Sequence, residues 1–308
     1  MTATCPICQS FDFEYNGPYR GSHPVFLEKQ RVCCRNCGLI YANPMPDDCA
    51  LRKFNANYFT NAHGGNLQNK VSNAFFSGIA QLRIDYINSY LARHKKTVSK
   101  ILELGPGPGF FASNWLKTHP ESTYSAIETD KTCHATLKKF GVRIIDSEDR
   151  QIKSESCDLL VMSHVLEHVS SPIHFLSSVT RNLRKGGVVF IEVPCRDWEH
   201  KAIDEPHLLF FDKEPMKLLL GKLGFIDIQV TYHGKKILDL QKSPKIASAM
   251  MGLRSKLIEL GVIAPFSRKR HGMEELTSAL ERAVLAPYQA HQESLEPAWW
   301  LRAVAIQA

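Results

Sequence analysis

The sequence has no long hydrophobic run and no leader pattern. None of its uninterrupted apolar stretches reaches the roughly 18 residues that span a bilayer, and the opening MTATCPICQS does not place basic residues before an apolar stretch. Internal repeats and low-complexity tracts are also absent. With 308 residues, 44% hydrophobic and 22% charged, the composition excludes collagen-like, disordered and disulfide-stapled miniprotein classes. We therefore expect a cytoplasmic protein without a membrane span.

The charge balance says little about partners. A formal net charge of +7 favours anionic partners such as nucleotide sugars, phosphorylated metabolites or nucleic acid, but it does not choose among them.

The nine cysteines are unevenly distributed, and four of them form two CxxC pairs near the N-terminus. Cys5 and Cys8 form the first pair, and Cys34 and Cys37 form the second. Four thiolates from two such turns complete a tetrahedral zinc shell, and zinc binding would supply folding free energy that so short a segment cannot obtain from burial. The odd cysteine count favours reduced thiols. We expect these four residues to hold structural zinc; Cys33 as a substitute for Cys34, an incidental cluster and a redox pair are the alternatives.

Apolar segments of strand length alternate with helical patterns in the middle of the chain. The strand candidates are KILELG, TYSAIE, VRIID, CDLLVMS and GGVVFIEV, and GFIDIQVTYH follows as a late strand. Alternation of this kind predicts a parallel sheet wrapped by helices. The pattern of cysteines and apolar residues divides the whole chain into four predicted segments. These are a zinc-binding head (residues 1–45), a helical lead-in (46–97), an α/β core (98–233) and a helical C-terminal extension (234–308).

A glycine-rich turn follows the first strand of the core. ILELGPGPGFF carries Gly105, Gly107 and Gly109, with Glu103 two residues before the first glycine. Glycines let the backbone approach a ligand closely. Dinucleotide enzymes use similar turns, but the GxGxG spacing and the preceding acid favour another ligand. Glu128 closes the next strand, where its carboxylate could accept hydrogen bonds from both hydroxyls of a ribose.

Four motifs in this order resemble those of class I S-adenosylmethionine-dependent methyltransferases: ELGPGPG, AIETD, CDLLVMSHVLEHVSSP and LRKGGVVFIEVP, over residues 98–195. The resemblance implies a doubly wound, Rossmann-like α/β fold with a mostly parallel seven-stranded sheet, and S-adenosylmethionine as cofactor. It implies that the glycine loop with Glu103 lies at the methionine part of the cofactor and that Glu128 holds the ribose. It also implies Asp146 near the adenine, and His164 at the border of cofactor and substrate.

Two further segments bear on the chemistry. Glu167 and His168, in LEHV, are expected to cap or pack the turn after the fourth strand. EPHLLFFDKEPMKLLLGKLGF is similar to a region after the fifth strand of small-molecule methyltransferases, which implies an acid and a histidine over the methyl group. His207 is our candidate base, since an imidazole titrates near neutrality, and Glu205 is the acid; ordering a substrate lid is the alternative for both.

The N-terminal head suggests what kind of molecule accepts the methyl group. CPIC…CRNCGLIYANPMP followed by LRKFNANYF resembles the zinc-binding head of methyltransferases from polysaccharide, deoxysugar and natural-product pathways. This implies a small polar acceptor such as a sugar or a nucleotide-linked sugar. Only about 75 residues follow Gly234, too few for the second doubly wound domain of relatives that methylate carbon, so O- and N-methylation stay open.

Two other functions are alternatives to this one. An RNA methyltransferase would use the basic segment SRKRH (267–271) for phosphate contacts. The head lacks interleaved aromatic and basic residues, and no base-methylation motif is present, which argues against nucleic acid. The intact glycine loop and Glu128 argue against a scaffold that has lost its cofactor.

Overall fold

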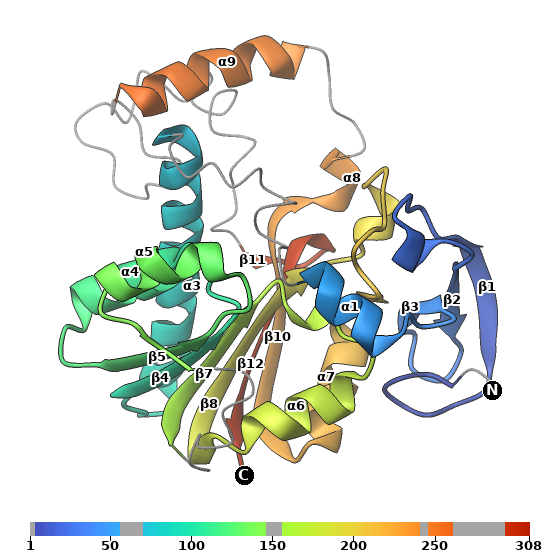
Figure 1. Ribbon diagram of the computed structural model, residues 1–308, viewed down its shortest axis with the longest axis horizontal. Helices are drawn as coiled ribbons and strands as arrows, with labels where there is room; N and C mark the ends of the chain where they lie inside the picture. The colour runs from blue at the N-terminus through green and yellow to red at the C-terminus, as the bar shows by residue number, and fades with distance from the viewer. Residues whose placement is uncertain (1–3, 56–69, 146–155, 241–245, 261–292) are drawn as a thin grey trace.

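The computed structural model describes residues 4–55, 70–145, 156–240, 246–260 and 293–308. These residues form a central eight-stranded sheet flanked by helices, and a four-stranded sheet at one end (Figure 1). The central strands, in sheet order, are β11 (Glu293–Ser294), β10 (Phe225–Lys236), β12 (Ala298–Gln307), β8 (Leu183–Pro194), β7 (Cys157–Ser163), β4 (Lys100–Leu104), β5 (Thr123–Ile127) and β6 (Arg143–Ile144).

Five of these strands run parallel, from β6 through β5, β4 and β7 to β8, and β12 lies antiparallel between β8 and β10. The sheet is therefore mostly parallel, as predicted. Seven strands match the expected number, and β11 adds a two-residue pairing at the edge beside β10.

Helices cover both faces of the sheet (Figure 1). The helices are α1 (Asp48–Asn55), α3 (Lys70–Arg93), α4 (Phe110–Thr118), α5 (His134–Lys139), α6 (Pro172–Thr180), α7 (Lys213–Lys222), α8 (Ile237–Leu240) and α9 (Ile246–Glu259). In β7, Leu159 and Val161 pack with α3, α4 and α5, whereas Leu160 and Met162 pack with α6 and α7. Because both faces are covered, the strand reads as a continuous apolar run in the sequence.

The last described strand differs from the prediction. A helical extension over 234–308 was expected, but residues 298–307 form β12, and this part of the prediction is wrong. The segment AWWLRAVAIQ is buried along almost its whole length between two partner strands, and this pairing outweighs the helical pattern of the residues before it. Helices α8 and α9 do agree with the expectation; the amphipathic pattern at 276–284 lies outside the described residues.

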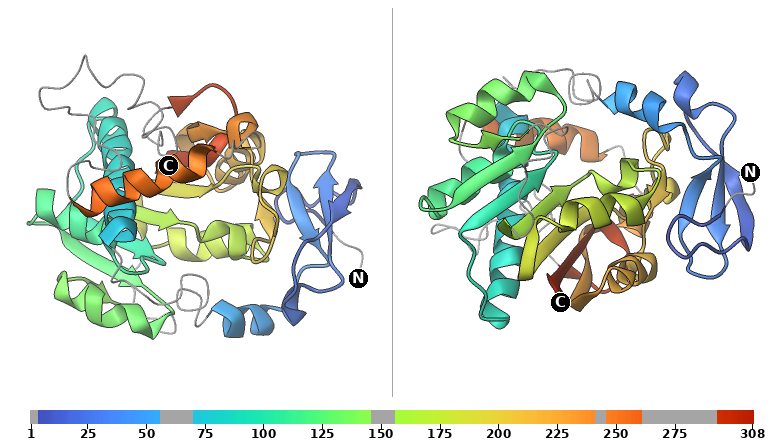
Figure 2. Two further views of the ribbon diagram at one scale, coloured as in Figure 1. Left: turned by 90° about the horizontal axis from the view of Figure 1, so that it is seen from above. Right: turned by 60° about the horizontal axis from the view of Figure 1, so that its bottom comes forward.

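The four-stranded sheet joins the head to the core. The head supplies β1 (Phe13–Pro18), β2 (Gln30–Cys34) and β3 (Ile40–Asn43), and the core supplies β9 (Leu209–Phe210), which pairs with β3. Figure 2 shows the head at the side of the core, next to the loop between β8 and β9. The described residues also contain short 3-10 helices: η1 (Pro24–Phe26), η2 (Lys131–Cys133), η3 (Leu166–His168) and η4 (Asp197–Glu199). The bounds of the four proposed segments stay a prediction.

Candidate functional site

The glycine loop lies at the carboxyl end of β4, where α4 begins. Gly105, Gly107 and Gly109 all have positive φ, at 62°, 54° and 82°. A Cβ on Gly105 would lie 2.8 Å from Cγ2 of Val165, and one on Gly109 would lie 2.7 Å from Cδ2 of Leu137. Backbone conformation and space therefore both require glycine at these two positions, which leaves bare peptide groups at the edge of the sheet.

Glu128 follows β5 and is bonded to the glycine loop. Its Oε2 accepts the amide hydrogen of Gly107 at 2.8 Å, and its Oε1 accepts that of Asp130 at 2.8 Å. Burial raises the pKa of Glu128, although the two amide bonds oppose this shift. Each carboxylate oxygen has a second lone pair, so the group could also accept the hydroxyls of a ribose. Loop and acid thus form one unit at the strand ends, where open sheets bind ligands.

Of the two other residues expected at the cofactor, the structure describes only Glu103. Glu103 is 4% exposed, and the hydroxyl of Tyr124 donates to its Oε2 at 2.6 Å inside the sheet. Burial raises the pKa of Glu103 to about 7. A contact of Glu103 with the cofactor stays a prediction. Asp146 lies outside the described residues.

His164 stands directly after β7, beside the glycine loop. Its φ is 58°, and its imidazole is 36% exposed. Nδ1 lies 3.3 Å from Oε1 of Glu167, and Nε2 lies 3.4 Å from Oε1 of Glu192. Burial lowers the pKa of His164, but these two carboxylates outweigh it and the net pKa is raised. Glu192 is in turn buried against Arg302, with Nε to Oε2 at 2.7 Å, and against Arg83.

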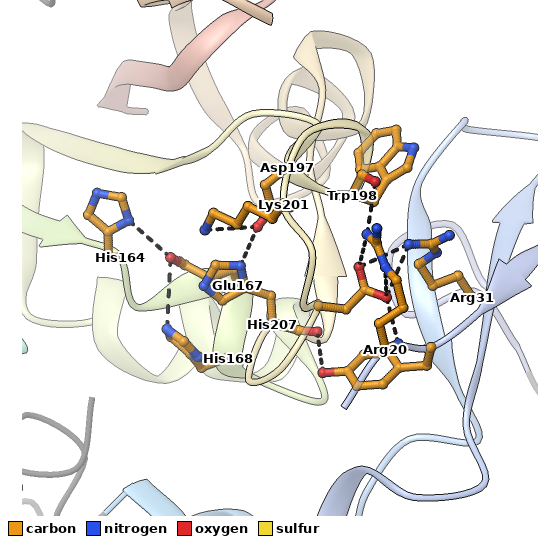
Figure 3. Close-up of polar contacts among 11 residues, drawn as sticks. Arg20, Arg31, His164, Glu167, His168, Asp197, Trp198, Lys201 and His207 are labelled. Atoms are coloured by element: carbon orange, nitrogen blue, oxygen red, sulfur yellow. Dashed lines mark hydrogen bonds and ion pairs between the residues drawn. The ribbon is translucent and has the colours of Figure 1, made fainter. Parts of the chain in front are cut away.

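The turn after β7 and the loop before β9 bring three further groups together (Figure 3). Glu167, His168 and His207 are 1%, 9% and 7% exposed. The rings of His168 and His207 meet edge to face, with centroids 5.0 Å apart. Burial lowers the pKa of His168 to about 4. Sequence reasoning gave Glu167 and His168 only a capping or packing role and did not connect them with His207.

Asp197 orients His207. Its Oδ2 lies 2.5 Å from Nδ1 of the imidazole, and the Lys201 ammonium lies 3.2 Å from the same oxygen. Burial would raise the pKa of Asp197, but His207 and Lys201 outweigh it and hold the pKa well below its usual range. No sequence motif pointed to Asp197; the only signal was an acid ten residues before the histidine.

The loop that carries His207 is tied to the head (Figure 3). Asp204 is buried, and both of its oxygens accept from Nη1 of Arg31, at 2.9 and 3.0 Å; Arg20 also pairs with it. The Tyr19 hydroxyl donates to the carbonyl of His207 at 3.0 Å. Glu205, expected beside His207 as a catalytic acid, instead has Oε2 bonded to the backbone amides of residues 22 and 23, at 2.8 and 3.0 Å. Its catalytic role stays a prediction.

The four cysteines of the CxxC pairs come together in the head. Sγ of Cys5 lies 3.5 Å from Sγ of Cys37, Sγ of Cys8 lies 3.4 Å from that of Cys34, and all four sulfurs lie within 4.8 Å of one another. A zinc–sulfur bond of about 2.3 Å separates the sulfurs of a tetrahedral shell by about 3.8 Å, so the cluster fits zinc. The sulfurs are too far apart for disulfides, which have a bond of about 2.05 Å. Cys33 directs its thiol to the carbonyl of Cys34 instead.

Comparison with known proteins assigns the fold to a family. Residues 77–230, half of the chain, match the family model described as a methyltransferase domain. The chain belongs to this methyltransferase family. The matched residues form a methyltransferase domain, the type of domain that transfers methyl groups to an acceptor. No described helix of the methyltransferase is both long and apolar enough to cross a membrane.

One solved structure and one curated sequence are similar to this methyltransferase. A crystal structure of a SAM-dependent methyltransferase from Thermotoga maritima superposes with a TM-score of 0.51 at 16% identity, over 84% of this chain and 100% of that one, which shows a shared fold. An uncharacterized protein of Methanocaldococcus jannaschii is 26% identical over 141 residues, which are 42% of this chain. The chain spans 66% of that curated relative, slightly less than two thirds of its length.

Proposed function

We propose that this methyltransferase acts on a small polar metabolite, a sugar or a nucleotide-linked sugar, at the sheet edge between the glycine loop and His207. One observation carries the proposal. The glycine loop and Glu128 are bonded together through Gly107 at 2.8 Å, and a buried, oriented imidazole lies on the neighbouring loop. Val165 connects the two parts, because it touches the space above Gly105 and immediately precedes the turn that packs on His207.

In this proposal the donor side is held mainly by backbone. The loop from Gly105 to Gly109 lies under the methionine part of the cofactor, and Glu128 accepts the ribose hydroxyls with its remaining lone pairs. His164 borders the cofactor, and its partly exposed imidazole lies between the carboxylates of Glu167 and Glu192. The roles proposed for Glu103 and Asp146 rest on the resemblance of the motifs alone.

The chemistry requires alignment and the removal of one proton. S-adenosylmethionine supplies a methyl group on a sulfonium, whose sulfur keeps the bonding electrons when the methyl leaves. Holding the acceptor in line at about 3 Å can account for much of the barrier reduction. A hydroxyl acceptor must lose its proton as the new bond forms. Asp197 holds Nδ1–H of His207, which leaves Nε2 free to take that proton.

We also propose that Cys5, Cys8, Cys34 and Cys37 hold a structural zinc ion. Four sulfur ligands leave no open coordination position, so the zinc would not take part in methyl transfer. Its contribution would be to fold the head, whose β3 pairs with β9 two residues after His207. The basic segment 267–271, on which an RNA acceptor depended, lies outside the described residues, and nothing described favours that alternative.

The donor half of the proposal is tested by calorimetry with S-adenosylmethionine. Glu128→Ala should weaken binding by about 1–3 kcal/mol, the cost of losing a charged hydrogen-bond partner. Glu121→Ala is the matched control, because Glu121 is an exposed acid before β5. Equal affinities of the two variants would refute the ribose role.

The acceptor half is tested by methyl-release assays over a panel of sugars and nucleotide sugars. His207→Ala should lower turnover by roughly a hundredfold while sparing donor affinity, as expected for the loss of a proton acceptor. Normal turnover of the variant would leave His207 as a lid residue. Steeply salt-dependent binding of RNA, with no activity on the panel, would replace the sugar acceptor by RNA.

A further inference from the structure

A buried cluster of three potential ligands lies beside the proposed reaction site, apart from the four cysteines. Glu167, His168 and His207 each present one ligand atom within 4.8 Å of the others. Both oxygens of Glu167 are fully buried and make no hydrogen bond with any described residue; the imidazole nitrogens beside them are Nδ1 of His164 at 3.3 Å and Nε2 of His168 at 3.8 Å. A buried carboxylate is costly unless a positive charge or hydrogen bonds compensate it.

We propose that Glu167, His168 and His207 bind a divalent transition-metal cation. One carboxylate and two imidazoles suit zinc, manganese, iron or cobalt, whereas magnesium and calcium prefer oxygen ligands alone. Three protein ligands leave at least one coordination position for another molecule, as in catalytic rather than structural metal sites. The cation would neutralise the buried carboxylate and draw the three groups closer together.

The Asp197–His207 contact supports this site independently. Imidazoles that bind metals usually donate their other N–H to a carboxylate, which fixes both tautomer and ring orientation. Asp197 Oδ2 lies 2.5 Å from Nδ1 of His207, so Nε2 is the nitrogen left to bind a cation. The head residues Tyr19 and Arg31 contact the loop, at the carbonyl of His207 and at Asp204, and hold the backbone of this ligand in place.

The position of the cluster suggests what the cation would do. Its ligands on the η3 turn follow directly after Val165, which touches the space above Gly105 in the glycine loop. If the proposed function is correct, the cation would bind an acceptor oxygen next to the methyl donor. In that case Nε2 of His207 would bind the cation and could not act as the base. The cation would lower the pKa of the acceptor hydroxyl instead, and the proton would pass to solvent water. His164, with Nδ1 at 3.3 Å from Glu167, would be a candidate fourth ligand.

The test counts metal ions in the full-length protein and does not depend on activity. The protein is saturated with Co²⁺, dialysed, and analysed for cobalt per chain and for visible absorption. The wild type should retain two ions: one with intense sulfur-to-cobalt bands from the cysteines and one with only weak bands typical of nitrogen and oxygen ligands. Glu167→Gln and His207→Ala should each lose the second ion, while His174→Ala, an exposed histidine on α6, should lose none.

Each outcome decides the proposal. Asp197→Asn should weaken the second ion's binding by about 10- to 100-fold, as for other groups that orient a metal-binding imidazole. A wild type that holds only the sulfur-bound ion, or cluster variants that keep both ions, would overturn it. Circular dichroism and donor calorimetry on the same variants identify any that fail to fold. Because donor affinity is measured separately, failure of the proposed function would appear as absent S-adenosylmethionine binding with an unchanged ion count.

Discussion

The proposed donor side and the proposed acceptor side of the site are built in opposite ways. The proposed donor side comes mainly from one continuous segment, from Gly105 to Asp130, and the contacts within it are made by backbone amides and one carboxylate. The acceptor side combines the turn after β7, the loop before β9 and residues of the head such as Tyr19. From this comparison we expect cofactor binding to depend on one short part of the chain and to survive changes elsewhere. Acceptor binding should depend on distant parts of the chain.

The strongest way to separate the two sides is to disable the head. Cys34→Ser removes one proposed zinc ligand, and structural zinc contributes on the order of 10 kcal/mol to the folding of such small units. We expect loss of the zinc, rapid amide exchange across residues 4–45 and a large fall in turnover, with donor affinity nearly unchanged. Mass spectrometry of the intact protein and of deuterated peptides measures the first two.

Cys33→Ser is the matched control for that variant, because its thiol lies outside the sulfur cluster. It should retain zinc and activity. Zinc loss from the Cys33 variant with retention in the Cys34 variant would reverse the ligand assignment. A parallel fall in donor affinity would contradict the independence of the two sides.

A narrower change cuts the main ionic link between head and loop. Asp204→Ala leaves the buried Arg31 without its carboxylate, which should cost about 3–5 kcal/mol of unfolding free energy. Asp12→Ala removes an exposed pair with Arg35 and should cost about 0–1 kcal/mol. Urea denaturation measures both, and similar values for the two variants would show that the link is not a stabilising contact.

The donor side has its own buried acid, and pH should reveal it. The pKa of Glu103 is about 7 in the folded protein, above the ordinary value of 4.5. The folded state therefore binds more protons than the unfolded state between these values, so this residue makes stability fall as pH rises from about 4.5 to about 7, by about 3 kcal/mol in total. Glu103→Gln should remove this loss.

Denaturation at pH 5 and pH 8 compares that variant with the wild type and with Glu121→Gln, an exposed control. The Glu103 variant should be more stable than the wild type at pH 8, with most of the gain gone at pH 5. An equal difference at both pH values would mean that Glu103 is not the residue responsible.

The smallest expected effect is on the glycine loop itself. Gly105→Ala places a Cβ at a φ of 62° and 2.8 Å from Val165, which should cost about 1–2 kcal/mol and weaken donor binding about tenfold. Gly221→Ala in α7, where a Cβ meets nothing within 4 Å, should instead stabilise the protein by about 0.5–1 kcal/mol. Calorimetry and thermal melting distinguish them; unaltered donor affinity in the Gly105 variant would place the cofactor elsewhere.

The sequence predicted what local patterns determine. Buried parallel strands such as CDLLVMS are continuous apolar runs, and the glycine loop follows its strand directly, so the sheet could be predicted from the sequence alone. β12 could not, because its strand conformation comes from pairing with β8 and β10. The Asp197–His207 and Asp204–Arg31 pairs also escaped prediction. Asp204 and Arg31 belong to segments far apart in the sequence, and Asp197 meets His207 only through the fold of the loop between β8 and β9; no spacing rule brings such partners together.

The pairing of β3 with β9 makes the head inseparable from the core. Ile40 lies opposite Phe210, and the amide of Ala42 donates to the carbonyl of Leu208 at 2.8 Å. Deletion of β1, β2 and β3 would remove the hydrogen-bond partners of β9 and expose Phe210, which is fully buried. A shortened enzyme would thus expose an unpaired, apolar strand edge that favours self-association. Pairing a substitute strand with β9 would cover this edge again.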